Sequence, residues 1–472
     1  MPMIMATDKK KEDTPRFLVG ACLGMCPYAE VRLRQRENLV HPLEMAVDSN
    51  GGRLNYVQPR AMVKEFSRSA AGHEIKASDI RPLPVLIKTM KYLLTSVCQR
   101  QDVSWAVVYQ FISDRLRAVR QDLCVQGLKN FTCIQLYLAA VRFYTYAHYR
   151  TCEHDLNDFD PYLNKKHLIE TLTLVISLFQ DQDTEEREHK INNASFRDDE
   201  LFSNNWDDSD EEELWSNGSE DTSESKIVQD AKISEKNSIP KRTETEESQS
   251  QSQSSEADIE EVVRDLNGAG ISKSSTDTEQ ASSSLSTDRR EEREHIMISG
   301  YSSREEAEAL YLLVNFGNEE VLKHAIELRK DIRCSELVSL AIKMNIAWIS
   351  CNYCRVLQLS TSLPPLFLCA FHAHMTMIQR TALGILSKAH SSKGLVYKQE
   401  DLAALLYFPS TRELKEACRH YGLTVTDEGV IFVKSAFNWN TPMMKPMRVK
   451  RIEDKLTNIQ LSELLLPNGL VL

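Results

Sequence analysis

The sequence predicts an all-α protein: a helical-repeat superhelix that ends in a small winged-helix module and carries a long disordered acidic insert. Three observations support this fold class. Apolar residues recur every three or four positions on both sides of the insert, strand patterns occur only near the carboxyl end, and acidic residues concentrate between positions 181 and 300. With 472 residues, of which 42% are hydrophobic, the chain is long enough for one large or two ordinary domains.

The helical pattern is clearest after the proline pair Pro82 and Pro84. There Leu86, Met90 and Leu93 are spaced by three and four residues, which places them on one helix face. The same spacing recurs in residues 105–123, 132–149, 168–179, 303–315, 321–328, 334–350 and 365–390. Because no strict sequence period is present, we expect an irregular helical array of the solenoid or superhelix type.

Residues 391–440 have the pattern of a winged helix. A short apolar strand at 394–397 is followed by helices at 399–407 and 411–420 and by a β-hairpin at 423–433. The second helix carries Arg412, Lys415 and Arg419 on one face, which Glu416 interrupts. In winged helices this helix often docks on nucleic acid, although the same module also packs against partner proteins.

The segment 181–300 has the composition of a disordered insert. It is rich in Ser, Glu, Asp and Gln and holds too few apolar residues to offset the entropy of ordering. Its net charge is −20, whereas the rest of the chain carries +9. Ser209 precedes four acidic residues and is a candidate phosphorylation site, unless this acidic run is merely solvated chain.

These patterns divide the chain into six parts. We expect a disordered amino terminus at residues 1–15, followed by the first helical part at 16–180 and the insert at 181–300. The second helical part then covers residues 301–390, the winged-helix module 391–440, and a basic carboxy-terminal tail 441–472.

The amino-terminal motif Met25-Cys26-Pro27 and several later motifs resemble the Sac-three/GANP family, named for germinal-centre-associated nuclear protein. The later motifs include residues 63–70, the cluster around Arg117 and Asp122, and residues 305–308. The residues of this family signature are Gly20, Cys22, Met25, Cys26, Pro27, Glu30, Arg81, Pro82, Leu83 and Pro84. The resemblance covers most of the chain outside the insert, and it implies a helical scaffold of the PCI or TPR type that ends in a winged helix.

The resemblance implies two functions. Larger family members organise nuclear mRNA-export complexes at the pore, but this chain has no phenylalanine-glycine repeats, RNA-recognition domain or acetyltransferase region. It is similar to the short Sac-three-domain-containing members, which are associated with centrosome duplication, spindle assembly and mitotic progression. We therefore expect a non-enzymatic scaffold of nucleus and cytoplasm, at centrosome or spindle, that binds PCI-type or small helical partner subunits. The alternative is an RNA-binding subunit of a nuclear mRNA-export complex.

Basic residues are the candidate contacts for nucleic acid or for partner proteins. Residues 60–68 would place three of them on one helix face, the helix before the hairpin adds three, and the tail adds four. They are Arg60, Lys64, Arg68, Arg412, Lys415, Arg419, Lys445, Arg448, Lys450 and Arg451. The simpler interpretation of these charges is a solvated surface, and an acidic insert on the same chain would compete with phosphates for them.

No sequence motif indicates catalysis, a cofactor, a metal, a small-molecule substrate or a membrane span. The 11 cysteines are scattered, as is typical of reduced thiols in the nucleus or cytoplasm. Cys351 and Cys354 form a single pair, short of the four ligands of a structural zinc site, and their apolar surroundings predict core thiols. Cys26 would lie at a helix amino terminus, so it is either a reactive thiol or, as we expect, an apolar anchor of the arm.

Overall fold

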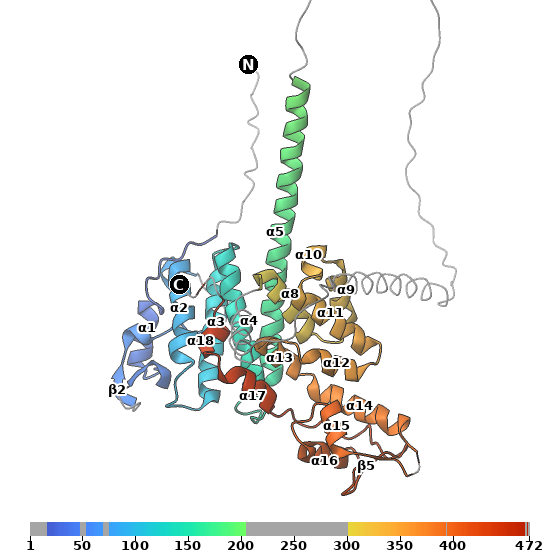
Figure 1. The fold of residues 1–472 in the computed structure, drawn as a ribbon. Helices are drawn as coiled ribbons and strands as arrows, with labels where there is room; N and C mark the ends of the chain where they lie inside the picture. The colour runs from blue at the N-terminus through green and yellow to red at the C-terminus, as the bar shows by residue number, and fades with distance from the viewer. Residues whose placement is uncertain are drawn as a thin grey trace, which may run out of the picture. The chain divides into compact units, whose positions relative to one another are not determined.

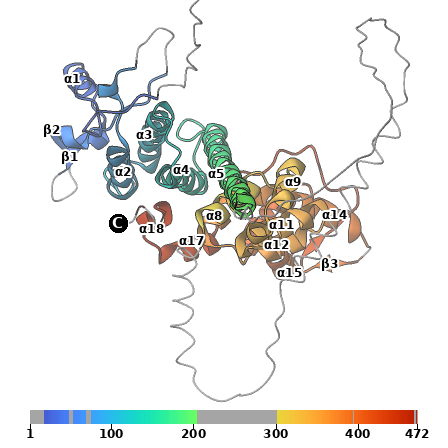
Figure 2. The ribbon, with the colours of Figure 1, turned by 90° about the horizontal axis from the view of Figure 1, so that it is seen from above.

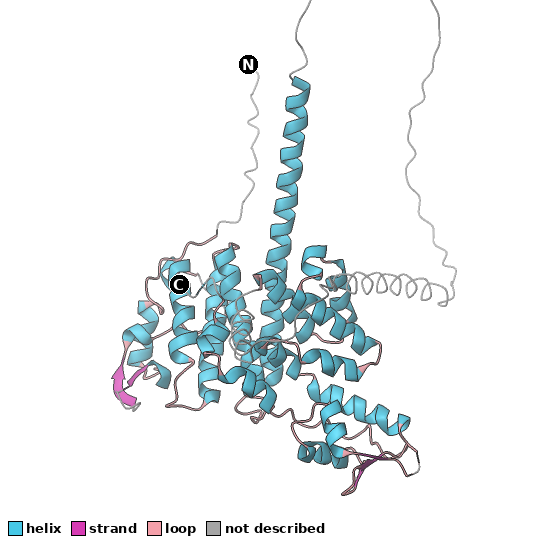
Figure 3. Cartoon of the chain, in the orientation of Figure 1, coloured by secondary structure: helices cyan, strands magenta, loops and turns pink. Residues whose placement is uncertain are grey.

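The computed structural model describes residues 17–47, 53–68, 75–203, 301–392, 394–467 and 470. Contacts divide the chain into one unit of residues 1–179 and 272–472 and a second unit of residues 180–271. Helices dominate the described residues, as the sequence predicts, and few strands occur (Figure 3). The all-α class is therefore confirmed.

The first unit begins with short elements and then builds a row of helices. The early elements are α1 (Tyr28–Arg36), η1 (Pro42–Glu44), β1 (Met45–Val47), β2 (Arg53–Val57), η2 (Pro59–Ala61) and η3 (Ala77–Asp79). They are followed by α2 (Leu83–Tyr92), a π-helical turn η4 (Leu93–Val97), α3 (Trp105–Val125), α4 (Phe131–Arg150) and α5 (Pro161–Ser203). In Figures 1 and 2, α2, α3 and α4 lie side by side.

Helix α4 lies at the centre of the core. Its first turn is capped by the Asn130 side chain, which accepts a hydrogen bond from the backbone N–H of Cys133. The four consecutive residues Leu138, Ala139, Ala140 and Val141 are fully buried, although successive side chains on a helix point in different directions. A helix that is buried all round needs neighbours on every side, and α4 packs against α2, α3, α8, α13 and α18.

The chain after the insert continues the same core. Its helices are α8 (Ser303–Val314), α9 (Glu319–Glu327), α10 (Lys330–Arg333), α11 (Glu336–Ile349), α12 (Tyr353–Ser360), α13 (Pro365–His372) and α14 (Met375–Ala389). Ser302 and Glu305 form a reciprocal capping box that fixes the start of α8. Because α8 and α13 both pack on α4, the segments before and after the insert share one core.

A small mixed module follows α14. Strand β3 (Val396–Tyr397), helices α15 (Gln399–Leu405) and α16 (Thr411–His420), and strands β4 (Thr424–Val425) and β5 (Val430–Ile431) occur in the predicted order. The antiparallel sheet has the order β3-β5-β4, and the register pairs Tyr397 with Val430 and Val425 with Val430. Strand β5 of the hairpin is therefore the central strand of this sheet.

Two expectations from the sequence differ from the structure. Residues 62–68 are not helical, and the hairpin of β1 and β2 precedes them. Helix α5 continues to Ser203, past the predicted start of the insert at residue 181. Positions 204–300, with Ser209, and positions 1–16 lie outside the described residues.

The segment 441–472 is not a simple tail. It contains α17 (Lys450–Thr457) and α18 (Leu461–Leu465), and α18 packs on α4 while α17 packs on α13. Ile452, Leu465 and Leu470 are almost fully buried. These apolar side chains hold the segment against the core, so the prediction of a basic tail, which rested on its charged residues, is incomplete.

Candidate functional site

The amino-terminal signature forms an extended arm that packs on the helical core. The backbone N–H of Cys22 donates to the carbonyl of Ile80 at 2.9 Å, and the N–H of Gly20 donates to Oε1 of Gln126 at 3.0 Å. A side chain at Gly20 would place its Cβ 2.7 Å from the carbonyl oxygen of Ile80. Glycine is therefore required at this position because the two backbones approach so closely.

Asp122 on α3 is the centre of a buried ion-pair network beneath the arm. Its carboxylate accepts from Nζ of Lys64 and from Nε of Arg81, both at 2.6 Å. The Asp122 and Arg81 side chains are fully buried. Arg81 also donates to the carbonyl of Met25 at 3.3 Å, so the network ties the signature motif to α3. A buried charge cluster of this kind is stable only while every partner is present.

A second buried cluster surrounds Arg34 on α1. Arg34 pairs with Glu44 and donates to the carbonyl of Val63 at 3.2 Å, while Glu44 accepts from the N–H of Val63 at 3.0 Å. Arg115 of α3 joins through Glu65 at 2.8 Å. These ion pairs and hydrogen bonds fix α1 against residues 63–65 and α3, and so they help to position the arm.

Cys26 is an anchor of the arm and not a reactive thiol. Cys22, Met25 and Cys26 are all buried. Burial raises the pKa of Cys26 far above the ordinary value of a thiol, and the nearby carboxylate of Glu30 raises it further. Helix α1 begins at Tyr28, with Pro27 as its N-cap. A thiol that stays protonated at neutral pH is a poor nucleophile, which leaves the anchoring interpretation.

The structure separates the ten predicted basic contacts into different groups. Arg60, Lys64 and Arg68 do not share a helix face, because only Pro59–Ala61 form a short 3-10 turn there. Lys64 is buried against Asp122 and the carbonyl of Asp79. The prediction of a basic helix face at residues 60–68 was therefore wrong, since the buried Lys64 charge is neutralised inside the fold.

The structure places the three predicted basic residues of α16 on one face of a helix. Ser410 caps the helix, and Leu414, Ala417 and Cys418 point into the core. Arg412 and Arg419 are exposed and Lys415 is half-buried. The Nε of Arg412 lies 3.1 Å from Oε1 of Glu416, so one of the three cations has an acidic neighbour on the same helix.

The four basic residues near the carboxyl end are not equivalent. Lys445 pairs with Asp155 and Arg448 with Glu153, each at 3.4 Å. Both pairs hold the segment before α17 against the loop that follows α4. Within the described ranges, neither Lys450 nor Arg451 pairs with a carboxylate, and both are exposed. Lys450 and Arg451 are thus the cations of this segment that are available to a partner.

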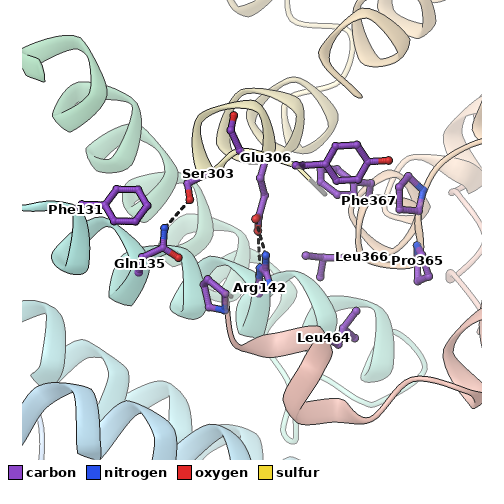
Figure 4. Close-up of a pocket in the computed structure, with 13 residues that line it drawn as sticks. Phe131, Gln135, Arg142, Ser303, Glu306, Pro365, Leu366, Phe367 and Leu464 are labelled. Atoms are coloured by element: carbon purple, nitrogen blue, oxygen red, sulfur yellow. Dashed lines mark hydrogen bonds and ion pairs between the residues drawn. The ribbon is translucent and has the colours of Figure 1, made fainter. Parts of the chain in front are cut away.

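An unpredicted cavity of ≈ 310 Å³ lies where α4, α8, α13 and the carboxy-terminal segment meet (Figure 4). In it, Arg142 faces Glu306, and its Nε and Nη2 each lie 2.6 Å from a carboxylate oxygen. Gln135 donates to Ser303 at 2.5 Å. Residues such as Phe131, Leu366 and Phe367 form apolar walls. No local pattern along the chain indicates this pairing, because 164 positions separate Arg142 from Glu306.

The remaining cysteine prediction was wrong in one respect. Cys351 and Cys354 are exposed free thiols and not core thiols. Cys351 has a φ of 55° at the end of α11, a turn conformation that carries its side chain outward. Across the part of the chain that the structure describes, no three His, Cys, Asp or Glu residues gather as metal ligands. Within the same residues, no helix combines the length and apolarity that crossing a bilayer requires.

The described part of the chain is thus a helical array with buried ion-pair networks, a cavity whose apolar walls surround an ion pair, and exposed basic residues on α16 and α17, which defines a scaffold-like helical protein. Comparison with known proteins gives the family. The profile of the SAC3/GANP family matches residues 25–235 and 279–427. The chain belongs to the SAC3/GANP family.

Curated relatives match over a shorter region. SAC3 family protein B of Arabidopsis thaliana is 30% identical over 179 residues, which is 37% of this chain and 10% of that protein. SAC3 family protein 1 of Schizosaccharomyces pombe is 30% identical over 31% of this chain and 14% of its own length. Protein xmas of Drosophila melanogaster is 26% identical over 34% of this chain and 8% of its own length. The matches therefore span 8–14% of these relatives.

Proposed function

We propose that this protein is a non-enzymatic scaffold that acts in centrosome duplication, spindle assembly and mitotic progression. The observation that carries the proposal is the single core that joins the segments on both sides of the insert and holds buried ion pairs such as Arg81–Asp122 and Arg142–Glu306. Membership of the SAC3/GANP family supports a scaffold role. The resemblance of its motifs to short members of the family favours the mitotic setting.

The proposal includes finer features of the fold and its partners. The helical array is a PCI-like superhelix, and the module from β3 to β5 is a winged helix. Two features support the winged-helix assignment: the order of the module's elements and its antiparallel sheet, in which β5 pairs with both β3 and β4. Partner subunits of the PCI type or small helical proteins would pack on the helical array and on this module. The protein would reside in the nucleus and cytoplasm and gather at centrosome or spindle in mitosis.

Imaging the full chain through the cell cycle tests the proposal. A fluorescent tag on the chain at its natural expression level should gather at centrosomes or spindle poles from prophase onward. Depletion should produce abnormal centrosome numbers, and re-expression of the full chain should restore them. A tag that stays at the nuclear rim in interphase, together with nuclear retention of mRNA on depletion and normal spindles, would refute the mitotic role.

The exposed basic face of α16 favours a second candidate function, an RNA-binding subunit of a nuclear mRNA-export complex. Arg412, Lys415 and Arg419 lie on the helix that contacts nucleic acid in many winged helices. The exposed Arg412 and Arg419 would reach phosphates, with the half-buried Lys415 between them on the same face. Glu416 and the acidic insert oppose such contacts, because each competes with phosphate for the same cations.

Salt dependence distinguishes RNA binding from scaffolding. If α16 contacts phosphates, charge reversal of Arg412, Lys415 and Arg419 should weaken binding to single-stranded RNA and flatten the slope of log K against log salt by up to about three units. A chain without residues 204–292 should bind more tightly than the intact chain. The measurement is fluorescence anisotropy across a series of salt concentrations.

A matched variant controls for net charge. Reversal of Lys88, Lys323 and Arg355 makes the same change in charge at exposed positions of α2, α9 and α12. It should leave the slope nearly unchanged. The RNA-binding candidate is lost if neither the intact chain nor the chain without residues 204–292 shows salt-dependent binding, or if both triple reversals have the same effect.

A further inference from the structure

We propose that a groove between α17 and the end of α15 binds an acidic peptide segment of a partner protein that carries large apolar side chains. The groove, called the C-terminal groove below, has a cavity volume of ≈ 680 Å³. The residues that define it in this argument are Leu368, Met375, Tyr407, Phe408, Lys450 and Arg451. This inference deepens the proposed scaffold function and rests on it.

The floor of the groove is apolar and adaptable. Leu368 and Met375 come from α13 and α14, and Phe408 follows α15. A smaller hollow of ≈ 60 Å³ shares Met375 and Phe408 with the groove and continues to Glu416 on α16. A methionine at such a surface fits side chains of different shape because it is unbranched and flexible. The concave apolar floor suits leucine or aromatic side chains of a peptide.

The rim of the groove is basic. Lys450 and Arg451 are exposed, and among the described residues neither pairs with a carboxylate. Lys455 adds a third cation, which donates to the backbone carbonyls of Thr361 and Leu363. Asp454 is the acidic side chain that lines the groove. Because cations exceed anions on this rim, an acidic segment complements it.

Tyr407, which lines the groove, has a backbone conformation that is unusual for a residue with a large side chain. Tyr407 follows the end of α15 and has a φ of 55°, a conformation that favours glycine after a helix. The Nε2 of Gln379 donates to the carbonyls of Leu406 and Tyr407 and holds this turn. The guanidinium of Arg451 lies 5.1 Å from the centre of the Tyr407 ring. An aromatic residue thus occupies a glycine-type position, where its ring lines the groove and supports a rim cation.

The same features favour a peptide over RNA in this groove. A single-stranded nucleic acid is usually held by several aromatic side chains that stack on successive bases. Here the walls include aliphatic Leu368 and Met375, and Tyr407 is already covered by Arg451. An interface with an apolar centre and a charged rim is typical of protein partners.

Binding of a defined acidic peptide to the full chain tests the proposal. The probe is a fluorescein-labelled synthetic peptide with the sequence of residues 205–217, NWDDSDEEELWSN, which combines six acidic residues with two tryptophans and a leucine. The intact chain should bind it saturably in anisotropy measurements. A second peptide in which serine replaces Trp206, Leu214 and Trp215 keeps the charge, and it should bind at least about tenfold more weakly.

Two groove variants and one control locate the binding site. Tyr407→Gly removes the ring and relieves the positive φ, so affinity should fall about tenfold while the melting temperature is maintained. Asparagine also tolerates a positive φ, so Tyr407→Asn should show the same loss of affinity and the same maintained melting temperature. Reversal of Lys450 and Arg451 to glutamate should also weaken binding about tenfold. The control reverses Lys88 and Lys323 and should change affinity less than about twofold.

Several results would overturn the proposal. These are no binding below about 1 mM, equal binding of the serine peptide, an unchanged affinity of Tyr407→Gly, or competitive displacement of the probe by single-stranded RNA. Much tighter binding by a chain without residues 204–292 would assign the groove to the chain's own acidic insert instead. The proposed function fails separately, through the localisation of the intact chain, so the two failures are distinguishable.

Discussion

Replacing Asp122 with asparagine should lower the free energy of unfolding by about 3–5 kcal/mol. The carboxylate lies at 2.6 Å from both Lys64 and Arg81, and all three groups are buried. An amide of the same shape removes the negative charge and leaves two buried cations without compensation. Urea denaturation followed by far-ultraviolet circular dichroism measures the change. The amino-terminal arm should also become sensitive to protease, because Arg81 no longer holds the carbonyl of Met25 firmly.

Asp155 provides the matched control for this prediction. Its carboxylate pairs with Lys445 at 3.4 Å, and both side chains are mostly exposed. The same aspartate-to-asparagine change at this surface pair should cost less than about 1 kcal/mol. Comparable losses at the two positions would mean that the network around Asp122 is not what stabilises the arm.

The helices were predictable because their signal is local. Leu86, Met90 and Leu93 lie within one short segment, and their burial in the structure follows from the spacing alone. The order of elements in the small module was also predictable, since each strand and helix of residues 394–433 has its own short pattern. Membership of the SAC3/GANP family followed from motifs in the correct order along the chain.

Features that depend on distant partners were not predictable in the same way. Lys64 reads as a surface cation until Asp122, 58 positions later in the chain, is placed beside it. The sequence predicts a basic tail at the carboxyl end because the charged residues come first there. The leucines that follow them are buried in the structure and anchor the segment to the core. Tyr407 has no sequence signal at all for its positive φ, because glycine is the residue expected there.

Removing the charge of Glu306 should be nearly as damaging as removing that of Asp122. Glu306 lies in the first turn of α8, after the insert, and forms a bidentate ion pair with Arg142 of α4, with both side chains more than nine-tenths buried. Arg142 also donates to the carbonyl of Leu466 at 3.0 Å. The pair therefore joins three parts of the chain. Glu306→Gln should lower the free energy of unfolding by about 3–5 kcal/mol, because a buried guanidinium loses its counter-charge.

A double-mutant cycle shows whether this loss comes from the pair itself. Arg142→Met and Glu306→Leu should each destabilise strongly, but the double variant should recover much of the loss, since an apolar pair of similar volume replaces a buried ion pair at little cost. The control is Glu305→Gln on the same helix, where glutamine preserves the capping box with Ser302 and should cost less than about 0.5 kcal/mol. Urea denaturation of all variants gives the coupling energy. Additive losses in the cycle would show that Arg142 and Glu306 stabilise the core independently, and that the contact between the segments before and after the insert depends on apolar packing alone.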